Sequence, residues 1–268
     1  MTRALREYER VERRVLSAVR CVDATTLAPV DDPLVVEAAG ARVIRNRSGL
    51  YVIRSWTRLA AHEDAFEAPP AAPPVGNDSL VLDVRDPGGR YLARRVAVAL
   101  PRDPALPPDN AASLFRAVDI TMYPSASAPL SGNWVALRVT VTDSGSGDAL
   151  GGALLRVVAG GRVLARGLSD WRGEALVPVA GVPITTWSTE PDAVVVSEIA
   201  ASLECYFDAA AGTRTPAADV RAGRAPAAPP LPNPQTIEAA RAGLPQAAVP
   251  IVLAAGRPLA TTIAVAVA

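Results

Sequence analysis

The sequence predicts an all-β protein of two tandem antiparallel sandwiches, with a short N-terminal helix and a Pro-rich arm in the second sandwich. From Ala153 to Val179, short runs of Val and Leu alternate with glycine-bearing turns, a pattern typical of antiparallel strands. Runs and turns follow in the same order from Leu16 to Trp56. The 268 residues are enough for two domains of about 100 residues each.

Composition and charge limit the classes of function. The 27 basic residues, all arginine, balance 27 acidic ones, so no overall field attracts nucleic acid or an anionic membrane. The first 20 residues are too charged for a secretory signal and no long apolar run is present, which predicts a cytoplasmic chain. Cys21 and Cys205 are expected to be isolated buried thiols, with a single bridge between them as the alternative.

Residues 1–15 predict an amphipathic helix. Leu5, Tyr8 and Val15 fall at helical spacing, and arginine and glutamate lie between them. A helix this short is marginal alone, so something must cover its apolar stripe. The cover is either the protein's own sandwich or a partner, and the sequence leaves both open.

Residues 16–100 predict the first sandwich because they match the second half at nearly constant spacing. Asp23 corresponds to Asp143 at a spacing of 120 residues (143 − 23 = 120). The turn at Gly49 corresponds to the turn at Gly173 at a spacing of 124 (173 − 49 = 124). Matching order of strands and turns over this length indicates a repeat.

A second correspondence closes each half. The turn and alternating strand of Gly89–Leu100 match those of Gly256–Val267 at a spacing of 167 residues (256 − 89 = 167). Each is preceded by a predicted hairpin partner, Leu80–Val84 in the first half and Val249–Leu253 in the second. The pattern predicts two copies of one sandwich unit, the second enlarged by an insertion.

Residues 101–133 predict the connector between the sandwiches. The segment begins Pro-rich and then contains the strand-like run Ala117–Tyr123. A connector with its own strand predicts a rigid pair, because a flexible coil would let the domains swing. The second sandwich then occupies residues 134–268, beginning with the strand Trp134–Thr142.

Residues 208–248 predict an arm inserted into the second sandwich. Residues 225–235 are Pro-rich and predict an extended or polyproline segment. Thr236–Gly243 predicts a short helix that Gly and Pro end. An arm this long is either disordered or laid along another subunit, and we expect the second because the arm carries few charges.

The elements that follow Asp143 resemble the carboxypeptidase regulatory-like, or transthyretin-like, Ig-like β-sandwich. In that family a Ser/Thr-Asp-x-x-Gly turn joins two strands, and Ser169–Gly173 fits this pattern. The resemblance extends over about residues 16–100 and 134–267 and implies the fold of each half. It implies no catalytic residue and no cofactor. Gly173 is expected to need a positive φ in this turn.

No group of residues in the sequence suits catalysis, so a non-enzyme without metal or cofactor is predicted. The single histidine, His62, lies in a Pro-rich loop without a nearby metal-ligating partner and is expected to be solvated. Residues 142–148 resemble a calcium-binding loop but lack the closing glutamate. A plain polar loop is therefore favoured there.

The resemblance leaves two settings for function. Family members with a secretion signal are surface modules, whereas others belong to phage tails and contractile injection particles that assemble in the cytosol. The missing signal favours a cap, collar or baseplate-associated structural component that binds itself and other tail-like particle subunits, with no nucleic acid or membrane partner. The alternative is a surface binding or adhesion module for carbohydrate or protein, in which Trp134, Trp171 and Trp187 are the candidate aromatic residues.

Docking between subunits is expected to use three apolar segments: the N-terminal helix, the Pro-rich arm and the terminal strand. Arms and edge strands of this kind add onto neighbouring sheets. The alternative for the terminal strand is that it closes its own sandwich. The predicted docking residues are Leu5, Tyr8, Val15, Pro229, Pro230, Leu231, Pro232, Ile263 and Val265.

Overall fold

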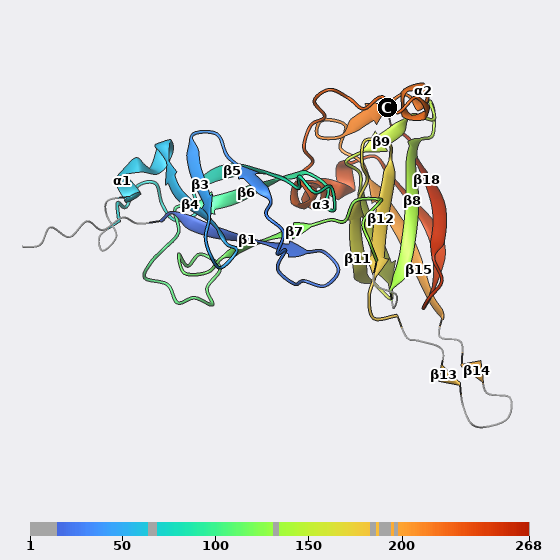
Figure 1. The fold of residues 1–268 in the computed structure, drawn as a ribbon, viewed down its shortest axis with the longest axis horizontal. Coiled ribbons are helices and arrows are strands. Elements are labelled where there is room, and N and C mark those ends of the chain that lie inside the picture. Colours follow the sequence, from blue (N-terminus) through green and yellow to red (C-terminus); the bar gives the residue numbers. More distant parts are fainter. Residues whose placement is uncertain are drawn as a thin grey trace, which may run out of the picture. The chain divides into compact units, whose positions relative to one another are not determined.

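The computed structural model describes residues 15–63, 69–130, 134–182, 186–187, 194–195 and 198–267. Most elements are strands in several sheets and the helices are few and short (Figure 1), which confirms the all-β prediction. Contacts divide the chain into a first unit (1–20, 37–82 and 97–119) and a second unit (21–36, 83–96 and 120–268). Within the described residues, the helices are too short and too polar to cross a membrane. The predicted N-terminal helix lies outside the described residues, apart from Val15.

Two sheets are built from the N-terminal half of the chain. One has the strand order β3-β4-β1-β7, and the other has the order β2-β5-β6. The strands are β1 (Ser17–Asp23), β2 (Val35–Glu37), β3 (Ala41–Arg45), β4 (Tyr51–Trp56), β5 (Asp78–Arg85), β6 (Arg94–Leu100) and β7 (Val118–Met122). The short helices η1 (Thr57–Leu59) and α1 (Ala60–Glu63) follow β4. Pairing of β5 with β6 confirms the predicted hairpin partner of the first half.

Alternation of apolar and polar residues explains these strands. In β6, every second residue from Arg94 to Leu100 is buried and the intervening residues are exposed. Val96, Val98 and Leu100 are each at most 5% exposed. Successive side chains of a strand point to opposite faces, so β6 buries one face and presents the other to water.

Two larger sheets are built from the C-terminal half. One has the order β12-β8-β9-β16 with β18 also paired to β8, and the other has the order β11-β10-β15-β17. The strands are β8 (Val135–Asp143), β9 (Ala149–Gly151), β10 (Leu154–Ala159), β11 (Arg162–Leu168), β12 (Glu174–Val179), β15 (Glu198–Tyr206), β16 (Thr213–Thr215), β17 (Gln246–Ala254) and β18 (Leu259–Val265). The remaining elements are β13 (Thr186–Trp187), β14 (Val194–Val195), α2 (Ala217–Arg221), α3 (Pro234–Ala240) and η2 (Arg241–Gly243).

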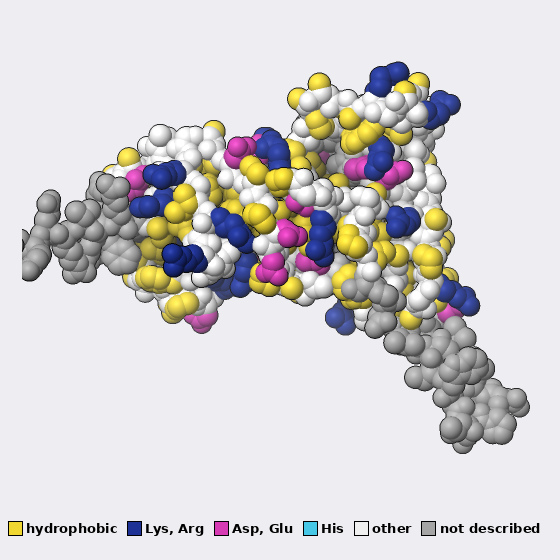
Figure 2. All heavy atoms as spheres, viewed as in Figure 1, with side chains coloured by type: hydrophobic (Ala, Val, Ile, Leu, Met, Phe, Trp, Pro, Cys, Tyr) yellow, Lys and Arg dark blue, Asp and Glu magenta, His cyan; other side chains and the backbone are white. Residues whose placement is uncertain are grey.

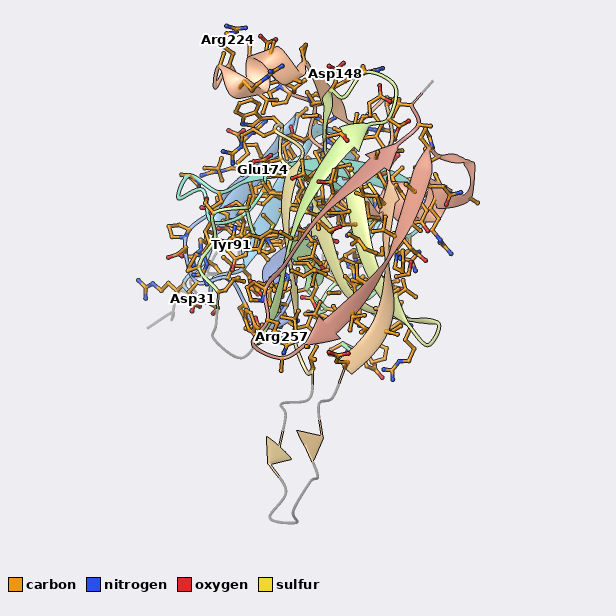
Figure 3. All side chains as sticks on the ribbon, turned by 90° about the vertical axis from the view of Figure 1, so that its right-hand side faces the viewer. Asp31, Tyr91, Asp148, Glu174, Arg224 and Arg257 are labelled. Carbon is orange, nitrogen blue, oxygen red and sulfur yellow. The ribbon has the colours of Figure 1, made fainter. Side chains whose placement is uncertain are left out.

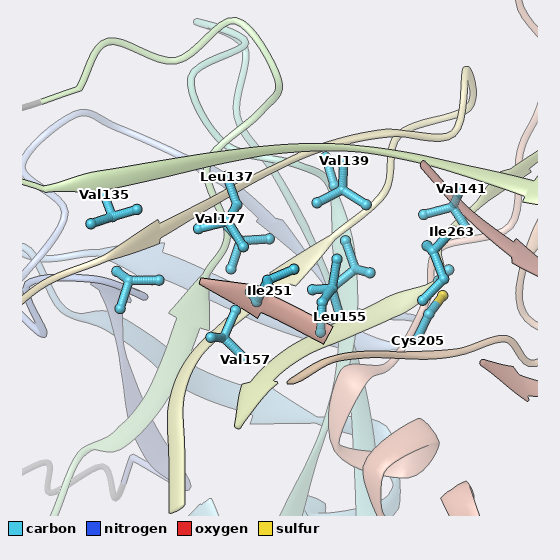
Figure 4. Close-up of a cluster of buried hydrophobic side chains, with 14 of the residues drawn as sticks. Val135, Leu137, Val139, Val141, Leu155, Val157, Val177, Cys205, Ile251 and Ile263 are labelled. Atoms are coloured by element: carbon cyan, nitrogen blue, oxygen red, sulfur yellow. The ribbon is translucent and has the colours of Figure 1, made fainter. Parts of the chain in front are cut away.

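The core of the second unit lies between these two sheets (Figure 4). Leu137 and Ile263 come from one sheet, and Leu155 and Ile251 come from the other. Leu137 and Leu155 are fully buried and Ile263 is 1% exposed. Each such aliphatic side chain contributes about 1.5–3 kcal/mol through the water that it excludes, so the facing sheets stabilise each other.

Hydrogen-bonded partners contradict one predicted strand pairing and one predicted correspondence between the halves. β17 pairs with β15, and β18 pairs in parallel with β8, so the predicted hairpin of Val249–Leu253 with the terminal strand is wrong. In the first half, β6 pairs with its predicted hairpin partner β5, whereas β18 pairs with β8 and not with β17. The predicted match of Gly89–Leu100 with Gly256–Val267 is therefore also wrong. The reason is that alternation shows that a segment is a strand but does not specify its neighbour.

Strand β7 is the run that the sequence placed in the connector between the sandwiches. In the structure it is hydrogen-bonded beside β1, at one end of the order β3-β4-β1-β7. Its residues Ile120 and Met122 are fully buried. β7 is thus a strand of the first half's sheet and not a spacer.

Two turns have the same hydrogen bonds in both halves of the chain. Asn46 and Asp170 each accept two backbone N–H bonds through one side-chain oxygen, from the residues two and four positions later, at 2.8–3.0 Å. Asp23 and Asp143 each close a loop in which their N–H donates to the carbonyl five residues later, at 2.9 and 2.8 Å. Gly173 has φ of +74° and Gly49 has φ of +77°, which confirms the prediction made for Gly173.

Helix α3 and the turn η2 confirm the helix predicted for Thr236–Gly243. The helix begins two residues earlier than predicted, at Pro234. The side chain of Asn233 accepts a hydrogen bond from the N–H of Gln235 at 3.2 Å. An Asn cap followed by Pro in the first turn is a favoured helix start.

Candidate functional site

Among the described strands, β18 has one backbone edge without a hydrogen-bonded neighbour. Its hydrogen-bonded neighbour among the described residues is β8, with a parallel register from Leu259 opposite Leu137 to Val265 opposite Asp143. The carbonyl of Val265 accepts from the N–H of Ser144 at 2.9 Å, so the backbone of Val265 faces β8. The N–H and C=O groups of successive residues point to opposite edges of a strand. Those of Ala260, Thr262 and Ala264 therefore face the open edge.

The open edge lacks three of the usual protections against pairing. β18 contains no charged residue, no proline and no bulge. Native edge strands usually carry such features because unpaired N–H and C=O groups recruit other strands. β17, at the end of the other sheet, has Pro250 within it. β18 is thus the better acceptor for an added strand.

A groove lies on the outer face of the same sheet, over β8 and between β12 and β18. Its volume is about 750 Å³, and Arg138, Thr140, Glu174, Ala260 and Thr262 are among its lining residues. Arg138 donates to the carbonyl of Ala126 at 2.8 Å at one side of the groove. The small side chains of β18 on this face leave room for the side chains of an added segment.

The structure separates the predicted docking residues into three groups. Leu5 and Tyr8 lie outside the described residues, and Val15 is 37% exposed. Pro229 and Pro230 are exposed, Leu231 is half-buried and Pro232 is buried. Ile263 and Val265 point into the core of their own unit. Their side chains are not available to a partner in this fold, and β18 can dock only through its backbone edge and outer face.

Part of the Pro-rich arm packs on its own unit, which corrects the expectation that the arm lies along another subunit. The N–H of Arg95 donates to the carbonyl of Pro232 at 2.8 Å. Ile237 is 1% exposed and packs with Leu154 and Tyr206. These contacts cover the apolar face of α3 within the chain. Docking by the exposed Pro229 and Pro230 stays a prediction.

The loop that resembles a calcium site is closed by a side chain of the protein itself. The carboxylate of Asp143 accepts hydrogen bonds from the hydroxyl of Ser146 at 2.8 Å and from the N–H of Gly145 at 3.2 Å. The guanidinium of Arg214 contacts Asp143 and also Asp148, the latter at 3.2 Å. The hydrogen bonds from Ser146 and Gly145 lower the pKa of Asp143 to about 2. An internal cation thus occupies the position between the two carboxylates.

We expect Asp143 to make the protein sensitive to acid. Its pKa of about 2 in the fold lies below the value of about 3.9 for an unfolded aspartate. The stability it contributes is therefore complete above about pH 4 and is lost as the pH falls from about 4 to 2. Urea unfolding between pH 2 and 7 should show this loss of unfolding free energy for the wild type. For Asp143→Asn the loss between pH 4 and 2 should be smaller.

The matched control for that measurement is Asp148→Asn. Asp148 shares Arg214 with Asp143, but it does not accept the Ser146 and Gly145 bonds. This control should lose as much unfolding free energy between pH 4 and 2 as the wild type does. An equally reduced loss in both variants would assign the effect to Arg214 instead of Asp143.

His62 and the two cysteines are buried. His62 is 2% exposed within α1, so the expectation of a solvated loop residue is wrong. The reason is that η1 and α1 bury the side chains that follow β4, including Leu59. Cys21 and Cys205 are free and buried, as expected. Burial raises the pKa of both thiols to about 12, which makes them unreactive at neutral pH.

The tryptophans do not form one aromatic platform. Trp134 lines a pocket of about 360 Å³ together with Tyr91, Asp31 and Arg90. Figure 3 labels Tyr91 and Asp31. Trp171 lines a separate pocket of about 190 Å³ beside Pro229 and Pro230. The side chain of Trp187 lies outside the described residues.

One hydrogen bond and one buried arginine of the second unit were not predicted from the sequence. The hydroxyl of Tyr91 donates to Asp23 at 2.9 Å, and nothing in the sequence indicates this pair. Arg94 is fully buried. Its position was detectable, because Arg94 is in phase with Val96 and Val98 on the buried face of β6.

Surface charge is dispersed on the face drawn in Figure 2. Basic side chains appear singly or in small groups, with acidic ones among them. This matches the balance of 27 basic and 27 acidic residues. The arrangement offers no broad single-sign patch on this face.

Comparison with protein-family models, with characterised proteins and with solved structures finds no match for this chain. The fold and its open edge define the class only as an all-β protein with sandwich-like packing of sheets. Function must therefore be argued from the surfaces described above.

Proposed function

We propose that the chain is a non-catalytic structural component of a phage-tail-like or contractile injection particle, and that it docks to neighbouring subunits by strand addition. The observation that carries this proposal is the unprotected edge of β18. Strand addition gains affinity from main-chain hydrogen bonds and specificity from alternate side chains. The groove of about 750 Å³ on the outer face of the same sheet is partly lined by β18 and leaves room for side chains that reach over this strand.

The proposal includes two tandem copies of one Ig-like sandwich. The order β4-β1-β7 in the first half parallels β12-β8-β18 in the second, and β2-β5-β6 parallels β10-β15-β17. The turns at Asn46 and Asp170 share their hydrogen bonds. One strand differs, because β3 joins β4 whereas β11 joins β10. A repeat with one strand exchanged between sheets accounts for both the likeness and the difference.

The occupant of the β18 edge in this proposal is an extended strand of a neighbouring subunit. Leu259–Val265 offers seven residues for pairing, which is an ordinary strand length. Ala260 and Ala264 face outward and are exposed, so they set no steric barrier to an added strand. Subunits joined in this way form a homo-oligomer or a mixed ring.

The test of this proposal is Thr262→Pro. A proline at this position removes an edge N–H and leaves the backbone that faces β8 in place. Size-exclusion chromatography with light scattering should show an oligomer for the wild type and a monomer for Thr262→Pro. Thr262→Val keeps the N–H and should assemble like the wild type. Circular dichroism of each variant verifies that the fold is retained.

Whether the chain belongs to a particle is tested by a separate experiment. Pull-down of the tagged chain from its native lysate, followed by mass spectrometry, should recover sheath-like or tube-like tail proteins, and Thr262→Pro should lose them. Oligomers of the chain alone, with no tail protein recovered, would retain strand addition and reject the particle. Docking through β18 would be rejected if the wild type were a monomer and its pull-down recovered the same proteins as that of Thr262→Pro.

A surface module that binds carbohydrate is the second candidate. The pocket of Trp134, Tyr91 and Asp31 favours it, because an aromatic ring and carboxylates are suited to the faces and hydroxyls of a sugar. Binding on a glycan array that Trp134→Ala removes would favour this function over the particle. A wild-type chain that binds no glycan would reject it.

A further inference from the structure

A second polar pocket lies in the second unit, away from the β18 edge. Its volume is about 380 Å³, and α3, β11 and the loop after β1 contribute to its walls. The polar lining residues are Thr25, Thr121, Tyr123, Arg166, Gln235 and Glu238. Leu27, at 72% exposure, and Leu164, at 39%, form an apolar rim.

Behind one wall of this pocket lies Arg94, a buried charge without a counter-ion. Its guanidinium donates to the carbonyl of Thr121 and to the side-chain oxygen of Gln235, and it lies 5.6 Å from the ring centre of Tyr123. All three of these contacts line the pocket. Within the described part of the chain, Arg94 contacts no carboxylate and its Nε has no hydrogen-bond partner. A buried charge in this state costs several kcal/mol relative to one that is paired.

The pocket is also rich in unused donors. The hydroxyls of Thr25, Thr121 and Tyr123 make no hydrogen bond with any described residue. Tyr123 is only 4% exposed, yet its hydroxyl oxygen is not among the fully enclosed, unsatisfied atoms. The side-chain oxygen of Gln235 accepts a hydrogen bond from Arg94, and the amide N–H groups of Gln235 remain free to donate. Several donors therefore converge on one cavity.

The one carboxylate in the pocket is already neutralised. Glu238 accepts two hydrogen bonds from Arg166, at 2.8 and 2.9 Å, and lies 3.5 Å from Arg156. Arg156 also pairs with Glu204 at 3.4 Å. Three arginines of this region thus face two glutamates, and the exposed Arg241 lies beside Glu238 as well. At least one positive charge remains unneutralised, and Arg94 holds it in a buried position.

We propose that this pocket binds a carboxylate, with the Tyr123 hydroxyl, the Gln235 amide and Arg166 as direct donors and Arg94 as the charge behind them. A monoanion matches the single unneutralised buried charge. The planar carboxylate accepts several hydrogen bonds at once, which suits the converging donors. The residues that line the pocket include none from β18, so this proposal does not rest on docking through that edge.

The first test compares sodium acetate with acetamide at constant ionic strength. The two molecules have nearly the same shape and differ in charge. Acetate should raise the melting temperature of the full chain as its concentration rises, and acetamide should not. Equal effects of the two molecules would overturn the proposal.

Variants locate the binding. Tyr123→Phe removes one hydroxyl, and Arg94→Met removes the buried charge while it keeps the bulk. Tyr123→Phe should weaken acetate binding by at least about tenfold, the usual loss for a hydrogen bond to a charged group. Arg94→Met should also weaken it, because the positive charge behind the donors is lost. Arg138→Gln, in the groove beside β18, should bind acetate like the wild type. If Arg94→Met does not fold, Arg166→Gln takes its place. Wild-type affinity in Tyr123→Phe and in the arginine variant would overturn the assignment.

Two sources of the carboxylate are distinguished by a second pair of probes. N-acetyl-glutamate amide presents the side chain of an acidic residue, as a docking protein would, and N-acetyl-glutamine amide is its neutral counterpart. Calorimetric binding of the glutamate probe together with acetate indicates a site open to protein side chains. Binding of acetate alone assigns the pocket to free small carboxylates.

Discussion

Gly173→Ala should lower the free energy of unfolding of the second unit by more than about 3 kcal/mol, which is large for one methyl group. Gly173 has φ of +74°, where a side chain is strained. A Cβ at this position would lie 2.3 Å from the carbonyl oxygen of Val141. The N–H of Val141 in turn donates to the carbonyl of Gly173 at 2.8 Å. The turn cannot move away without breaking this contact with β8.

The matched control is Gly49→Ala, in the corresponding turn of the first half. Gly49 has nearly the same φ, +77°, but a Cβ there would meet only the end of the Arg45 side chain, at 3.6 Å. This variant should lose about 1–2 kcal/mol, the cost of the backbone conformation alone. Urea unfolding followed by circular dichroism measures both variants. Similar losses in the two would show that the contact with Val141 is not what makes Gly173 necessary.

Arg94→Ala should destabilise the second unit by about 2–4 kcal/mol, through the cavity it leaves and through two acceptors that lose their donor. The acceptors are the carbonyl of Thr121 and the side-chain oxygen of Gln235. Gln235 belongs to α3, so the variant also weakens the attachment of that helix. The measurement is urea unfolding at pH 7.

Arg94→Met separates the charge from the bulk of the side chain. Burial lowers the pKa of Arg94, because enclosure without a carboxylate disfavours the charged form. Replacement of a whole buried ion pair by apolar residues of similar volume is often neutral or stabilising, but here the carbonyl of Thr121 and the side-chain oxygen of Gln235 would lose their donor. We therefore expect the methionine variant to lose less stability than Arg94→Ala, because its side chain fills the cavity while the same two acceptors stay without a donor. A loss as large as that of Arg94→Ala would mean that the hydrogen bonds, and not the packing, hold this region together.

The candidate docking site was predicted only in part. The terminal strand was expected to add onto a neighbour, and β18 does have an open edge. The side chains named for it, Ile263 and Val265, lie in the core. The reason is that inward and outward positions of an apolar strand look alike in sequence when the outward residues are Ala and Thr. The carboxylate pocket was not predicted, since residues far apart in the chain, such as Thr25 and Gln235, line it.

Local residue patterns were enough to predict the strands and turns of this protein. Alternating apolar residues and the turn residues Asn46, Asp170, Gly49 and Gly173 specify local conformation, because each acts on backbone only a few positions away. The tertiary structure alone decided which strands are neighbours. It placed β7 beside β1, β17 beside β15 and α3 over Leu154. The pairing depends on which apolar faces fit together, and these faces come from residues far apart in the chain. The periodicity of apolar residues does not specify the neighbouring strand.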